Sequence, residues 1–106
     1  MKIPGDLGAL LEQAQQMQQN IANLQAELEQ KTVQASAGGG MVTATVSGGM
    51  KLVQLSIEKT VVDPSDVDML QDLVTAAVNE ALRKAKEMMK EEMAKLTGGL
   101  PIPGMS

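Results

Sequence analysis

The chain has 106 residues and a formal net charge of −4, and it contains no His, Cys, Trp, Tyr or Phe. The length fits one domain. Without His the chain lacks the commonest general base, and without Cys it can form neither disulfides nor thiolate metal sites. The composition therefore argues against an enzyme and predicts neither cofactor nor metal. The N-terminal residues do not form a signal peptide and no apolar run approaches the ~20 residues of a membrane helix, which predicts a cytoplasmic protein with no membrane partner.

Residues 6 to about 30 show the pattern of a long amphipathic helix with one apolar seam. Alternating spacings of three and four join Leu7, Leu10, Ala14, Met17, Ile21, Leu24 and Leu28. Such a heptad seam is typical of a helix that packs along a partner helix over its whole length. The positions between them carry mainly Gln and Asn, which suit a solvent-facing surface. Polar contacts from these amides to a ligand or to phosphates are the alternative interpretation.

Three strands are expected next, at residues 32–37, 41–47 and 51–58, because apolar and polar residues alternate there. The run Gly38-Gly39-Gly40 separates the first two strands, and Gly48-Gly49 is expected to form a two-residue hairpin turn with positive φ angles. In the third strand the alternation predicts that Val53, Leu55 and Ile57 face inward. One apolar face per strand predicts an antiparallel meander covered on one side.

A second long helix is expected from Asp63 to about residue 96, with Asp63 as N-cap and Pro64 at the first helical position. Its length of roughly 50 Å exceeds the ~35 Å diameter of a compact chain of this size. Both helices should therefore project and be covered by a second copy, which predicts a homodimer. The expected dimer interface comprises Leu10, Met17, Ile21, Leu24, Leu28, Met88 and Met93. Residues 1–97 are expected to form the dimerising domain, and the Gly- and Pro-rich residues 98–106 a flexible tail.

A basic cluster on the second helix is the strongest candidate for a functional site. Arg83, Lys86 and Lys90 fall within about 60° on one helix face, and Lys84 lies about 100° away from Arg83. These four residues are the candidate DNA-binding residues, as donors to phosphate oxygens near the projecting end of the helix. An ordinary solvated face is the other interpretation, since Glu80 precedes Lys84 by four residues, the spacing of a helical ion pair.

Other motifs give no competing site. The Gly-rich segments lack the spacing of a phosphate-binding loop and do not lead from a strand into a helix. The carboxylates Asp63, Asp66 and Asp68 lack the Gly and the closing Glu of a calcium loop. Catalytic, cofactor-binding and metal residues are therefore predicted to be absent, as is a small-molecule substrate.

Several segments together resemble the YbaB/EbfC nucleoid-associated proteins. They are residues 7–18, 40–42, 46–48, 69–74, 76–81 and 100–104, which span nearly the whole chain. The resemblance implies an α+β fold of order α-β-β-β-α and a tweezer-like homodimer. It also implies duplex DNA binding with little sequence preference, altered DNA conformation, a role in organising the nucleoid and an effect on gene expression. Arg83-Lys84 matches the basic pair of that family.

The chain departs from this family in its first helix, where Glu12, Asn20, Asn23 and Glu27 stand where members often carry bases. Lys51 is also the one base of the third strand. DNA binding of micromolar affinity or weaker is therefore expected. The alternative function is a protein-interaction or scaffold dimer without direct DNA binding. Salt separates the two, because phosphate contacts release counterions and apolar contacts do not.

Overall fold

The computed structural model describes residues 5–96 and has the expected α-β-β-β-α order. Helix α1 spans Gly5–Gln30, the strands β1, β2 and β3 span Thr32–Ala37, Val42–Ser47 and Leu52–Ile57, a short 3₁₀ helix η1 spans Lys59–Val61, and helix α2 spans Val67–Leu96. The strands form one antiparallel sheet in the order β1-β2-β3. The α+β fold class is confirmed.

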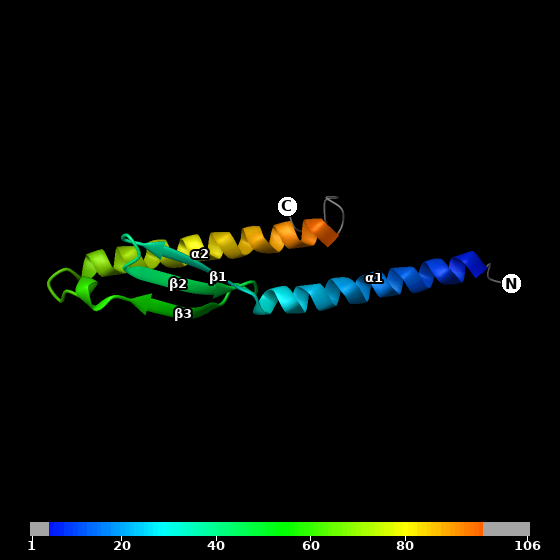
Figure 1. Cartoon of the computed structure of the whole chain (residues 1–106), viewed down its shortest axis with the longest axis horizontal. Coiled ribbons are helices and arrows are strands. Elements are labelled where there is room, and N and C mark those ends of the chain that lie inside the picture. The colour runs from blue at the N-terminus through cyan, green and yellow to red at the C-terminus, as the bar shows by residue number, and fades with distance from the viewer. Residues whose placement is uncertain (1–4, 97–106) are drawn as a thin grey trace.

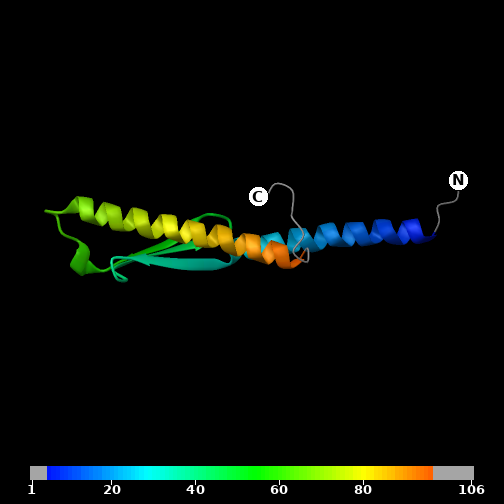
Figure 2. The ribbon, with the colours of Figure 1, turned by 90° about the horizontal axis from the view of Figure 1, so that it is seen from above.

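The core lies between α2 and one face of the sheet, as Figures 1 and 2 show. Small residues of α2 meet short aliphatic residues of the strands, so the helix axis approaches the sheet closely. The fully buried residues of this layer include Ala77, Ala81 and Ala85 of α2, and Val42, Ala44 and Val46 of β2. Alanine also has the highest helix propensity. The aromatic-free sequence thus builds a thin core in which the outer face of α2 stays open to solvent.

The chain is elongated, with extents of 79 × 20 × 18 Å and a radius of gyration of 20.7 Å. Helix α1 projects from one end of the sheet, and the last turns of α2 extend past the same end (Figure 1). The expected projection of the helices is therefore present within one chain. The predicted flexible tail, residues 98–106, lies outside the described residues.

Helix α2 begins at Val67, four residues after the predicted N-cap. Asp63 instead closes a turn, in which its carboxylate accepts bonds from Ser65 N at 2.9 Å and from Ser65 Oγ at 2.7 Å. Asp66 is the N-cap, since its carboxylate accepts the backbone N–H of Met69 at 3.3 Å. The prediction was wrong because Asp63 and Asp66 both offer a capping carboxylate and only the turn at Pro64 decides between them.

The β2–β3 turn also differs from its prediction. Positive φ angles occur at Gly38, Gly39 and Gly40 and at Met50, whose φ is 63°, but not at Gly48 or Gly49. What requires glycine at position 48 is a close approach: a Cβ there would collide with the backbone carbonyl of Leu28 and lie 2.9 Å from the sulfur of Met89. Gly48 is thus the point where the end of α1, the hairpin and α2 meet.

Val53 does not face inward, because β3 carries a bulge. The register shifts between Thr45 and Val46, so Val46 lies opposite Leu52 and Val53 is the extra residue. Val53 is 60% exposed, whereas Leu55 and Ile57 are half-buried and pack against the core as expected. A bulge breaks the period-2 alternation on which the prediction depended.

Candidate nucleic-acid interface

The basic face of α2 points away from the sheet. Arg83, Lys86 and Lys90 are all exposed, and Ala81 and Ala85, roughly opposite them on the helix, are buried against the strands. The alternation of buried alanines and exposed bases follows from the 3.6-residue period of the helix. The same helix therefore anchors the fold through one side and presents positive charge on the other.

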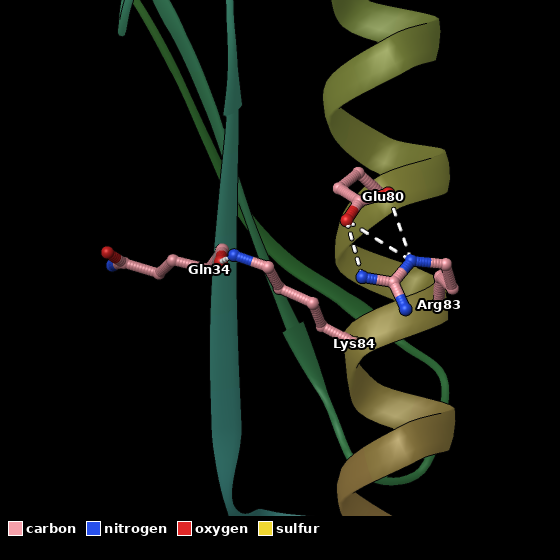
Figure 3. A network of polar contacts seen from close by, with 4 residues as sticks. All are labelled: Gln34, Glu80, Arg83 and Lys84. Carbon is pink, nitrogen blue, oxygen red and sulfur yellow. Dashed lines mark hydrogen bonds and ion pairs between the residues drawn. The ribbon is translucent and has the colours of Figure 1, made fainter.

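Arg83 is paired with a carboxylate one turn earlier in α2. Its Nη2 donates to Glu80 Oε1 at 2.7 Å, and its Nε lies 3.1 Å from Glu80 Oε2 (Figure 3). The hydrogen bond from Arg83 lowers the pKa of Glu80, and the bond to Glu80 raises the pKa of Arg83. The pair lies on the surface, where ion pairs are weak and water or phosphate can compete for the guanidinium.

Lys84 reaches in a different direction from Arg83. Its Nζ donates to the backbone carbonyl of Gln34 at 3.2 Å and so ties α2 to β1 (Figure 3). In the structure Lys84 thus helps to hold α2 against the sheet. Because its side chain is exposed, it can exchange this carbonyl for a phosphate. The four predicted DNA-binding residues are thus three bases on one face and one at the edge of the sheet.

Lys86 and Lys90 carry the most available charge of this set. Neither side chain forms an ion pair or hydrogen bond within residues 5–96, although Glu87 and Glu91 are on the same helix. Only Lys90 lies near the projecting end of α2, because Met89 is beside Gly48 at the end of the sheet. Arg83 and Lys84 lie alongside the sheet, which places the basic face nearer the middle of α2 than the sequence indicated.

The structure adds an ion pair between distant parts of the chain, Lys31 and Glu92, which the sequence did not indicate. Glu92 of α2 lies 3.9 Å from Nζ of Lys31 and 3.3 Å from Nζ of Lys95. Lys31 directly follows α1, so Glu92 connects the base of the projecting helix to α2. No local pattern predicts this contact, because its partners are 61 residues apart (92 − 31).

The predicted dimer-interface residues fall into three classes of exposure. Leu10 and Met17 are 60% and 53% exposed, and Ile21, Leu24 and Met88 are half-buried. Leu28 and Met93 are already buried within the single chain, at 4% and 2% exposure. The part of the seam that has no covering in one chain is therefore the N-terminal half of α1.

Residues 5–96 contain neither a membrane-spanning helix nor a metal-binding cluster. Neither helix in this range combines the length and apolarity that a bilayer crossing requires. No three acidic side chains in the range gather closely enough to hold a metal ion. The carboxylates of Asp63 and Asp66 accept backbone N–H groups, Asp63 in a turn and Asp66 at the start of α2.

Comparison with known proteins supplies the family. Residues 2–100 match the model of the YbaB/EbfC DNA-binding family. A nucleoid-associated protein of Thermoanaerobacter pseudethanolicus is 56% identical over 100 residues, covering 94% of this chain and 90% of that protein. A nucleoid-associated protein of Acetivibrio thermocellus is 54% identical over 102 residues, covering 95% of this chain and 90% of that one. The chain belongs to the YbaB/EbfC DNA-binding family.

A solved structure supports the fold separately. The crystal structure of an uncharacterized protein from Helicobacter pylori matches with a TM-score of 0.68, covering 91% of this chain and 99% of that chain. The sequence identity is 23%, so this likeness concerns the fold alone.

Proposed function

We propose that this chain binds duplex DNA as a homodimer with little sequence preference, and that it is a nucleoid-associated protein of the cytoplasm. The observation that carries the proposal is the exposed basic face of α2, formed by Arg83, Lys86 and Lys90 opposite the buried alanines. Membership of a DNA-binding family and the names of the similar proteins support it. The role is one of binding, not of catalysis.

The chemistry of this face favours the DNA backbone over the bases. Lysine and arginine donate to phosphate oxygens, which fix a protein on the duplex without reading its sequence. The chain has no aromatic residue to wedge between bases, and Arg83 is its single arginine. Changes of DNA conformation, organisation of the nucleoid and effects on gene expression would then follow from occupancy along the duplex.

The homodimer follows from the apolar seam of α1. Leu7, Leu10 and Met17 are 46–60% exposed along one side of a helix that projects from the sheet. A contiguous apolar surface of this kind is typical of an interface, and a heptad seam fits a second long helix. Leu24 and Ile21 continue the seam toward the sheet and are half-buried already.

A salt titration tests the proposal. Two copies of the four bases Arg83, Lys84, Lys86 and Lys90 give at most about eight phosphate contacts, so log K should fall with log salt at a slope no steeper than about −7. Binding that is absent at low salt would overturn DNA binding. The exposed seam also supports the second candidate, a protein-interaction dimer, for which binding to a partner should change little with salt.

A further inference from the structure

The two edges of the sheet differ in what covers them. At the β1 edge, Lys84 donates to the carbonyl of Gln34, and α2 packs across β1 and β2. Along β3 the side chains of Gln54 and Ser56 are exposed, and within residues 5–96 no side chain bonds to the backbone of this strand. An open edge is a template for pairing with another strand.

The hydrogen-bond pattern of β3 shows which backbone groups are available at this edge. Glu58 N donates to the carbonyl of Met41 at 2.9 Å, and hydrogen-bonded pairs alternate with non-bonded pairs in an antiparallel ladder. Ile57, opposite Val42, and Leu55, opposite Ala44, therefore occupy non-bonded positions. Their N–H and C=O groups point away from β2, toward solvent.

We propose that β3 pairs antiparallel with β3 of a second copy, about a two-fold axis at Ser56. This register uses the outward backbone groups, because Leu55 of one copy lies opposite Ile57 of the other. It also sets the amide of Gln54 opposite the carboxylate of Glu58. A register centred on Leu55 would instead set Lys51 opposite Lys59, and like charges directly opposite are destabilising.

The area buried by this strand pairing is too small to hold two separate copies together. Five paired residues span about 17 Å of a sheet about 10 Å thick, so the pairing buries on the order of 350 Å² in total. Stable interfaces bury about 1,200–2,000 Å². The β3 contact therefore joins copies that are already held close. It acts between neighbouring copies on DNA and makes their binding cooperative, so this inference rests on the proposed function.

A single engineered cysteine tests the pairing, because the chain has none of its own. Ser56 lies opposite itself as a non-bonded pair in this register, and the short Cα separation of about 4.5 Å in such pairs permits a disulfide. The matched control is Ser36→Cys, since Ser36 is exposed on the same sheet face of β1. On DNA, Ser56→Cys should crosslink at least about tenfold faster than Ser36→Cys, because pairing raises the effective thiol concentration.

Charge at position 54 gives a second readout in the Ser56→Cys chain. Gln54→Lys faces Glu58 of the other copy and should speed crosslinking, whereas Gln54→Glu should slow it. Equal rates for Ser56→Cys and Ser36→Cys, in samples whose gel shifts show bound DNA, would overturn the pairing. Equal rates for the two Gln54 variants would overturn its register. A wild-type chain that shifts no DNA overturns the proposed function itself and is seen in the same gel.

Discussion

Arg83 and Glu80 form an ion pair one helical turn apart, in which the Glu80 carboxylate accepts from Nε and Nη2 of the guanidinium. The closest contact is 2.7 Å, and both side chains are on the surface. Glu80 therefore occupies the Nε–Nη2 edge of the guanidinium, and a phosphate must displace it to bind Arg83 bidentately through that edge. In the proposed DNA interface this pairing makes Arg83 a weaker contact than its exposure alone indicates, and Lys86 and Lys90 are the readiest donors.

Replacing Glu80 should therefore strengthen DNA binding. Glu80→Gln keeps the size of the side chain and removes its charge, which frees the Nε–Nη2 edge of the Arg83 guanidinium for phosphate. We expect higher affinity and a salt slope steeper by up to about 2 for a dimer, one contact per chain. Glu29→Gln, the same charge change at the exposed end of α1, is the control. Equal slopes for the two variants would show that the pair with Glu80 does not limit the contact of Arg83 with phosphate.

Lowering the pH should act in the same direction. The bond from Arg83 lowers the pKa of Glu80 in the folded chain, so the pair is intact above the ordinary carboxyl pKa and is lost as the pH falls through the lowered value. In Glu80→Gln this acid-dependent loss should disappear. Chemical shifts of the Arg83 guanidinium, followed during an acid titration of both chains, measure it. A transition that is unchanged in the variant would contradict the pairing.

The N-cap of α2 can be assigned by paired substitutions. Asp66→Ala removes the carboxylate that accepts the N–H of Met69 and should cost about 1 kcal/mol in the free energy of unfolding. Asp63→Ala removes only the turn contacts to Ser65, so its cost should be smaller. Urea denaturation compares the two. A larger loss of unfolding free energy for Asp63→Ala would show that Asp63 is the N-cap, as the sequence predicted.

Gly48 and Gly49 are adjacent, but replacement by alanine should destabilise the fold only at Gly48. Gly48→Ala forces its new methyl group against the Leu28 carbonyl and should destabilise the fold by about 1–3 kcal/mol. At Gly49 a Cβ would meet Glu29 only at an ordinary 3.7 Å, so Gly49→Ala should cost little. Thermal unfolding of both variants measures the difference. Equal stability of the two would contradict the close meeting of α1 and the hairpin.

These contrasts also show how far the sequence could predict the structure. The heptad seam, the strand alternation and the 3.6-residue period predicted the fold and the common face of Arg83, Lys86 and Lys90, because each depends only on local repetition. The hydrogen bond of Lys84 to Gln34 and the ion pair of Lys31 with Glu92 depend on how distant elements pack, so no local pattern could predict them. The first contact separates Lys84 from the other three candidate bases, because it holds Lys84 at the β1 edge of the sheet.

A charge on the apolar seam of α1 should prevent dimerisation, whereas a charge on the opposite side of α1 should not. Leu10 is exposed in one chain, so Leu10→Asp should leave the single chain folded but bury an unpaired charge in a dimer, at a cost of several kcal/mol. Gln19→Asp, on the opposite side of α1, is the matched control. Light scattering should give a dimer for wild type and Gln19→Asp and a monomer for Leu10→Asp. A wild-type monomer at micromolar concentration would contradict the homodimer.

Charge reversal tests most directly whether the basic face of α2 binds DNA. A gel-shift series compares wild type with the triple variant Arg83→Glu, Lys86→Glu and Lys90→Glu, whose side chains are exposed and outside the core. We expect wild type to bind duplex DNA at low salt and the folded triple variant to bind none, because each reversed side chain replaces a phosphate contact with repulsion. Equal binding by the two chains would show that this face of α2 does not bind DNA.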